Sequence, residues 1–158
     1  MFYISYFYQI RFFPDTLVPV STAVYDPKWY HDNKGNNYLF KDKRGVINGV
    51  RCPGLAPLEE HIPWVTEEDK CVGREICNFD RTTCGFLRNY EKYIYSLDFN
   101  DTCSRIEAGV HKLKPNADIC LMVHEKFDNP CSEREVLVKW FRDNGVILNE
   151  WFPNKDSV

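Results

Sequence analysis

Hydrophobic and polar residues alternate along the first 13 positions of the chain. Ile4, Tyr6 and Ile10 stand at even-numbered positions, and Ser5, Gln9 and Arg11 stand at odd-numbered positions. A period of two with many aromatic residues predicts a strand over Ile4–Phe13. A second extended run predicts a strand over Val18–Tyr25. Pro19 has no N–H to donate, so the N-terminal end of this run is predicted to lie at a sheet edge or outside the strand.

From Cys84 onward the hydrophobic period becomes helical. Apolar residues spaced by three and four predict a helix over residues 84–97, whose buried face includes Leu87, Tyr90 and Ile94. A second helix is predicted from about Asp101 to Leu113, with Asp98 or Asp101 as its N-cap.

The clearest pattern lies in the last 40 residues. An apolar run predicts a buried central strand over Ile119–His124. Ser132 and Glu135 form an S-x-x-E capping box that opens a helix, and Val146–Trp151 is predicted to return as a strand. Such a β-α-β unit requires parallel strands and a right-handed crossover.

Residues 26–83 are predicted as a long, loop-rich connection. It contains a polar, turn-like stretch over His31–Gly35 and short strands of a hairpin at Tyr38–Phe40 and Gly45–Val50. The whole chain, residues 1–158, is therefore predicted to form one α/β domain. We expect a three-layer sandwich with a mainly parallel central sheet and helices on its faces.

Composition and charge narrow the function classes. An apolar fraction of 44% and an aromatic fraction of 15% allow a sizeable core. A net charge of −3 excludes a global basic field for nucleic acid, although a local basic patch stays open. No apolar run reaches the roughly 18 residues of a membrane span, so no membrane partner is expected. Seven cysteines cannot all pair internally, and no secretion signal is evident. We therefore expect reduced thiols and a cytoplasmic location. A secreted protein with disulfide bonds is the alternative.

The first candidate site is the turn after the predicted central strand. Cys131, just before a helix, is a candidate nucleophile or anion contact, and Glu125 is a candidate base or orienting group. Arg134 is a candidate phosphate clamp at a helix N-terminus, with Lys126 and Ser132 as further ligand-binding candidates. In the alternative interpretation, Cys131 is only the residue before a capping box, and Glu125 and Arg134 are ordinary surface charges.

Two other groups of residues are candidates for a functional site. Trp29 and Tyr30 lie among basic residues and are candidates for stacking on a base, against the alternative of a solvated loop with one or two buried aromatic residues. Cys71, Cys77 and Cys84, with His61 upstream, lack the C-x₂₋₄-C spacing of zinc sites. Glycine-rich nucleotide loops are also absent, so we expect no metal and no cofactor.

Four features, taken in order, resemble the family called domain of unknown function 488. They are Val18–Ala23 with Pro27–Tyr30; Leu55-Ala56-Pro57; the helix with Tyr90, Tyr93 and Leu97-Asp98; and Glu125-Lys126 followed by Cys131. The resemblance spans most of the chain and implies an α/β domain. The biochemical role of that family is not established, so the resemblance bears on the fold more than on the function.

The family signature near its last helix is approximately Cys-x-Glu-Lys, a gap, then Cys-His-Arg. Glu125, Lys126 and Cys131 match it directly. Val123 and Ser132 stand where the family has its first cysteine and its histidine, and Arg134 lies one position after the family arginine. If the signature is catalytic, the resemblance implies an altered or inactive member.

Three functional hypotheses remain open from the sequence. The first is a small enzyme, or degenerate enzyme, acting on a phosphate-bearing ligand such as a nucleotide or a nucleic-acid end at the 124–134 turn. The second is a binding module without turnover that sequesters a nucleotide-like ligand or a protein partner. The third is a purely structural or interaction protein.

Overall fold

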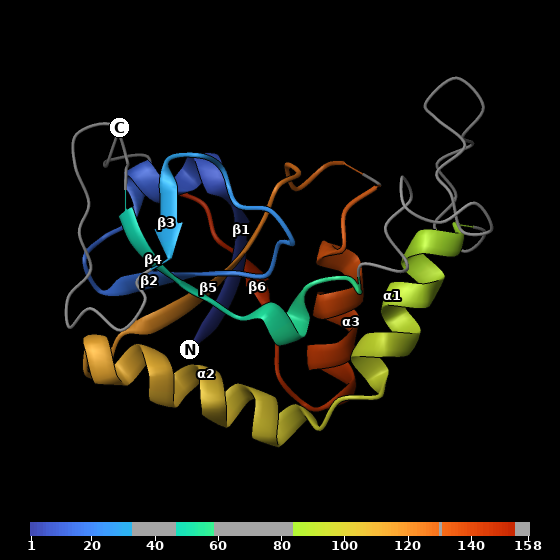
Figure 1. Cartoon of the computed structure of the whole chain (residues 1–158). Coiled ribbons are helices and arrows are strands. Elements are labelled where there is room, and N and C mark those ends of the chain that lie inside the picture. Colours follow the sequence, from blue (N-terminus) through green and yellow to red (C-terminus); the bar gives the residue numbers. More distant parts are fainter. Residues whose placement is uncertain (33–46, 59–83, 130, 154–158) are drawn as a thin grey trace.

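The computed structural model describes residues 1–32, 47–58, 84–129 and 131–153 (Figure 1). In this part of the chain a six-stranded sheet has the order β3-β4-β2-β5-β1-β6, and every neighbouring pair is parallel. The strands are β1 (Phe2–Tyr6), β2 (Leu17–Ser21), β3 (Tyr30–Asp32), β4 (Ile47–Arg51), β5 (Asp118–Val123) and β6 (Asn149–Glu150). The helices are η1 (Phe7–Phe12), η2 (Pro53–Leu55), α1 (Gly85–Tyr95), α2 (Phe99–Leu113) and α3 (Arg134–Asp143), where η marks a 3-10 helix.

The apolar strand β5 lies in the middle of the sheet, as its sequence predicts. It pairs with β1 on one side and with β2 on the other, and residues 119–123 are buried. A strand with neighbours on both sides and layers on both faces has no solvated face, which explains its continuous apolar run. The predicted single-domain α/β fold with a parallel sheet and a C-terminal β-α-β unit is confirmed.

The two faces of the sheet are covered differently. Side chains of β1, β2 and β5 meet α1, α2 and α3 in one core. On the other face, η1 and the Trp29–Tyr30 segment pack on Cys120 and Met122. In the described residues this second layer contains no α-helix, so the predicted three-layer arrangement has one thick and one thin outer layer.

The predicted strand over Ile4–Phe13 is wrong beyond Tyr6, where the chain turns into η1. Phe7, Ile10 and Phe13 are buried, and Tyr8 is 52% exposed. Buried residues three positions apart match the three residues per turn of a 3-10 helix. The large apolar residues of this stretch (Tyr6, Phe7, Tyr8, Ile10, Phe12 and Phe13) fit a period of two as well as a period of three, so the sequence pattern does not reveal the helix.

The prediction that Pro19 marks an edge is wrong, since β2 lies between β4 and β5. The amide of Thr22 bonds to Met122 of β5, whereas the carbonyl of Ser21 accepts from Cys52, on the β4 side. Pro19 shares the orientation of Ser21, and the ladder with β4 begins only at Val20. The nitrogen of Pro19 therefore points toward the β4 side of β2. On that side residues 17–19 have no described ladder partner, so no ladder hydrogen bond is lost.

Other predicted boundaries also need correction. β2 ends at Ser21 rather than Tyr25, and β6 covers only Asn149–Glu150 within the predicted Val146–Trp151. β4 pairs in parallel with β2 and β3, so it is not the strand of a hairpin, and Tyr38–Phe40 lie outside the described residues. β3 begins at Tyr30 and continues into the stretch His31–Gly35 that is predicted as a turn.

The predicted helices α1 and α2 are confirmed, and the carboxylate of Asp98 caps α2 by accepting from the amide of Asp101 at 2.8 Å. In the described part of the chain no helix is both long and apolar enough to cross a bilayer. All five cysteines in that part (Cys52, Cys84, Cys103, Cys120 and Cys131) are free thiols.

Helix α1 is fixed to the η2 turn through two tyrosine hydroxyls. Tyr90 is buried and donates to the carbonyl of Leu55 at 2.6 Å, and the more exposed Tyr93 donates to that of Gly54 at 2.6 Å. Tyr90→Phe is expected to lower the free energy of unfolding by about 2 kcal/mol, because it strands a buried carbonyl. Tyr93→Phe, the matched control, is expected to cost less than about 1 kcal/mol, since water replaces its bond. Urea denaturation measures both, and equal losses would contradict this account.

Candidate functional site: a crevice at the carboxyl ends of β2 and β5

The connections of the sheet diverge between β2 and β5. After β2 the chain continues to β3 at one edge, and after β5 it continues through α3 to β6 at the other edge. Neighbouring parallel strands whose connections leave in opposite directions open a crevice at their carboxyl ends, where α/β proteins bind ligands. The fold therefore points to the ends of β2 and β5.

A cavity of about 180 Å³ lies at this point. One wall is the segment after β2, the other is the segment after β5, and Glu133, just before α3, closes it. The lining residues are Thr22, Ala23, Val24, Tyr25, Pro57, Phe86, Val123, His124, Glu125 and Glu133. No lysine or arginine belongs to this described lining, so its formal charges are the two carboxyl groups and, when protonated, His124.

Glu125 and Glu133 form a pair of facing carboxyl groups. Burial raises the pKa of Glu133 to about 8, and the negative charge of Glu125 together with a hydrogen bond between the two carboxyl groups adds to this effect. Glu133 is therefore mostly protonated at neutral pH and donates to Glu125. Oε2 of Glu125 is buried, and no described residue donates a hydrogen bond to it. A carboxylate has about four acceptor positions, so one shared proton leaves most of them open.

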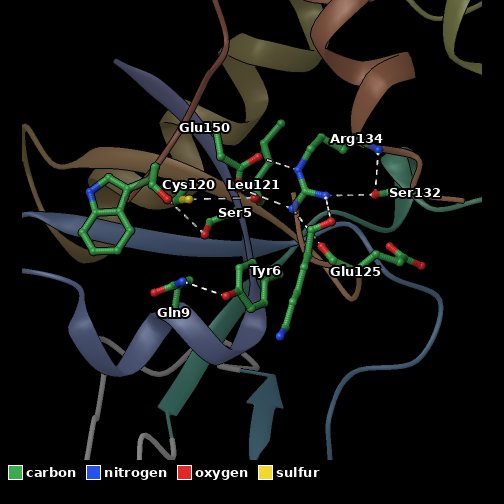
Figure 2. A network of polar contacts seen from close by, with 11 residues as sticks. Ser5, Tyr6, Gln9, Cys120, Leu121, Glu125, Ser132, Arg134 and Glu150 are labelled. Atoms are coloured by element: carbon green, nitrogen blue, oxygen red, sulfur yellow. Dashed lines mark hydrogen bonds and ion pairs between the residues drawn. The ribbon is translucent and has the colours of Figure 1, made fainter. Parts of the chain in front are cut away.

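Arg134 holds the wall that follows β5 (Figure 2). Its guanidinium forms a buried ion pair with Glu150 of β6 and donates at 2.8 Å to the carbonyls of Glu125 and Lys126. Longer bonds of 3.4 Å reach Ser132 Oγ and Glu150 Oε2. These contacts use all five N–H donors of the side chain, which is 4% exposed. The predicted role of Arg134 as a phosphate clamp is therefore wrong: its donors are used within the protein.

A second arginine holds the opposite wall. Arg51 Nε lies 2.8 Å from Asp26 Oδ2, and Nη2 donates at 3.2 Å to the carbonyls of Ala23 and Val24. The Ser21 hydroxyl also bonds to Asp26. Both walls of the crevice are thus fixed by arginine–carbonyl bonds before any ligand binds.

The remaining predicted residues of the 124–134 turn lie outside the cavity lining. Cys131 is exposed, and its amide donates to Asn129 Oδ1 at 2.8 Å. Ser132 is buried and accepts from the amide of Arg134 at 3.1 Å. α3 begins at Arg134, so it starts one residue later than the capping box predicts, and Cys131 is three positions from its first residue. Lys126 is exposed. A nucleophilic role for Cys131 stays a prediction.

Trp29 and Tyr30 do not line the crevice. Tyr30 is 4% exposed, its hydroxyl lies 2.6 Å from the carbonyl oxygen of Val50, and its ring occupies the space where Gly49 would carry a side chain. A Cβ at Gly49 would lie 1.9 Å from the Tyr30 ring. Trp29 is half-buried and packs edge-on against Phe7. The structure places both side chains in the core on the thin face of the sheet, so a ligand-stacking role for Tyr30 is wrong.

The sequence interpretation missed Glu133. In the comparison with the resembling family it stood at an arginine position and was treated as a departure. Its position offered one usable signal, an acidic residue at the start of a helix that follows a central strand, eight positions after another glutamate. Burial of Glu133 against Glu125 depends on how the intervening loop folds, which the sequence pattern does not specify.

Fold and site together define an α/β protein with two half-buried carboxyl groups, Glu125 and Glu133, at a strand crevice. Comparison with protein-family models, with curated proteins and with solved structures gave no match. The resemblance to domain of unknown function 488 therefore stays a prediction. No cluster of three metal-ligating side chains occurs in the described part of the chain, and His61, Cys71 and Cys77 lie outside it.

Proposed function

We propose that this protein binds a small ligand in the crevice between β2 and β5, and that Glu125 and Glu133 act on it as an acid–base pair. The observation that supports this most directly is the half-buried carboxyl pair, in which the buried atom Oε2 of Glu125 has no described donor. A buried acceptor without a partner costs free energy, and it persists where a ligand or water supplies the missing donor.

The two carboxyl groups take different roles because their environments differ. Glu133, whose pKa is raised to about 8, carries a proton at neutral pH and is the proton donor. Glu125 is the acceptor, in agreement with its predicted role as base or orienting group. A group with a pKa near the working pH transfers a proton efficiently in either direction.

The phosphate group of the ligand that the sequence hypothesis describes would have to lie outside the cavity. The described lining has no basic residue except His124, and Arg134 is fully engaged. A phosphate-bearing ligand would therefore place its phosphate outside the cavity, where Lys126 is exposed. The cavity itself suits a neutral or cationic group that donates hydrogen bonds.

A fragment screen by two-dimensional amide NMR tests this function. Small neutral and cationic fragments are expected to shift the amides of residues 22–25 and 123–125, and Glu125→Gln is expected to weaken their binding by about tenfold, since it removes the charged acceptor. Glu107→Gln, an exposed substitution on α2, is the matched control and should bind as the wild type does. Fragments that bind only elsewhere, or equally well to Glu125→Gln, would contradict the proposal. Incubating each binder with the protein then distinguishes turnover from sequestration.

A further inference from the structure

The shape and polarity of the crevice narrow the class of ligand. We propose that it takes a planar nitrogen heterocycle that carries a hydrogen-bond donor beside an acceptor on one edge, as a nucleobase does. This inference rests on the proposed function and adds the chemical class of the ligand.

The carboxyl pair offers complementary groups side by side. A neutral carboxyl group has one O–H donor, and a carboxylate has only acceptors. When a ligand enters, the O–H of Glu133 exchanges its bond to Glu125 for one to a ring nitrogen or a ring carbonyl, while Glu125 accepts from the neighbouring amine or ring N–H. A ligand of this kind supplies the donor that the buried Oε2 of Glu125 lacks. A guanidinium has donors only, so it offers no acceptor to the O–H of a neutral carboxyl group.

The size and walls of the cavity favour a small, flat group. Its volume of about 180 Å³ is below the roughly 300 Å³ of pockets that take drug-sized ligands, so it admits one small ring system. Pro57 and Phe86 contribute apolar surface, and Tyr25 on the lining is 63% exposed. Aromatic side chains beside a polar edge are suited to stacking on a heterocycle that hydrogen-bonds at that edge.

The proton on Glu133 makes this binding sensitive to pH. The charged or titratable groups around Glu133 are Glu125 and His124 after β5, Arg134 on α3 and Tyr90 on α1. Because burial and the Glu125 charge raise the pKa of Glu133 to about 8, its proton is present at pH 7 and mostly lost at pH 9. Binding that needs this donor must weaken across that interval.

Cytosine is the probe, with 1,3-dimethyluracil as a ring without a donor and methylguanidinium as a cation without an acceptor. Amide NMR titrations are run on the wild type and on the Glu125→Gln and Glu133→Gln variants. Cytosine is expected to shift residues 22–25 and 123–125, and 1,3-dimethyluracil to bind about tenfold more weakly or not at all. Cytosine affinity should fall by about tenfold from pH 7 to pH 9. In Glu133→Gln the amide keeps a donor that cannot ionise, so this pH dependence should disappear.

Each outcome has a distinct meaning. Tighter binding of methylguanidinium than of cytosine, strengthening toward pH 9, would overturn the heterocycle proposal and leave the crevice as a cation site. Fragments that bind in the crevice while cytosine does not would also overturn this inference alone. If no fragment and no probe shifts the crevice amides, both this inference and the proposed function fail. If Glu125→Gln does not fold, the pH dependence of cytosine binding to the wild type still decides the question.

Discussion

Replacing Arg134 with methionine is expected to lower the free energy of unfolding by roughly 3–5 kcal/mol. The substitution leaves Glu150 without its cation and removes the donors to the Glu125 and Lys126 carbonyls. Breaking one side of a buried ion pair is costly because the remaining charge stays desolvated. Burial already raises the pKa of Glu150, with Arg134 opposing this effect, so the variant should be less impaired at pH 5 than at pH 8.

Urea denaturation of Arg134→Met and of Arg142→Met tests this expectation. Arg142 is exposed in the last turn of the same helix, so its replacement should change the free energy of unfolding by less than about 0.5 kcal/mol. The double variant Arg134→Met/Glu150→Gln should recover part of the loss, since no buried charge is left behind. A loss below about 1 kcal/mol for Arg134→Met would show that the guanidinium does not hold the wall of the crevice.

Glu133→Gln is expected to stabilise the protein at pH 8 by roughly 3 kcal/mol and to leave its stability near that of the wild type at pH 5. The pKa of Glu133 is about 8 in the fold and about 4.5 ordinarily. One pKa unit corresponds to about 1.4 kcal/mol. Glu125 takes part in holding the Glu133 proton, so replacing Glu133 recovers only part of the corresponding free energy.

The direction of this pH dependence follows from proton binding. Between about pH 4.5 and pH 8 the folded chain holds a proton on Glu133 that the unfolded chain releases. The wild type therefore loses stability as pH rises through this window, and the glutamine variant does not. Urea denaturation at several pH values measures the difference, with the exposed Glu135→Gln on the same helix as control. A stability difference that does not change with pH would contradict the assignment of the proton to Glu133.

Much of the fold can be predicted from the sequence because its strongest signals come from burial. The continuous apolar run of β5 specifies a strand covered on both faces, and the helical period of α1 and α2 specifies one buried face each. Asp98 was one of two N-cap candidates, and the structure selects it. The end of β1 could not be predicted, because the large apolar residues of this stretch fit a strand and a 3-10 helix equally well.

The candidate site was predicted in position but only partly in chemistry. The turn after β5 and Glu125 were identified from the strand-to-helix pattern. The role of Arg134 was not, since the pattern does not show that Glu150, 16 positions later, returns beside it on β6. For Tyr30 the sequence leaves ligand stacking and burial as alternatives, and the absence of a side chain at Gly49 makes room for its ring in the core. Both outcomes depend on contacts between residues that are distant in sequence.

The position of β5 also constrains the order in which the chain can fold. β1 and β2 follow each other in sequence but do not touch as ladder partners: β5 lies between them, with Ile119 opposite Phe2 and Val18. The central ladders therefore close loops of about 100 residues or more, which is slow and entropically costly. During synthesis, the first two strands emerge long before β5. β2 can pair with β4 in this time, but the edges of β1 and β2 that face β5 remain unpaired until β5 leaves the ribosome. These exposed edges are the part of the nascent chain most open to pairing with other chains.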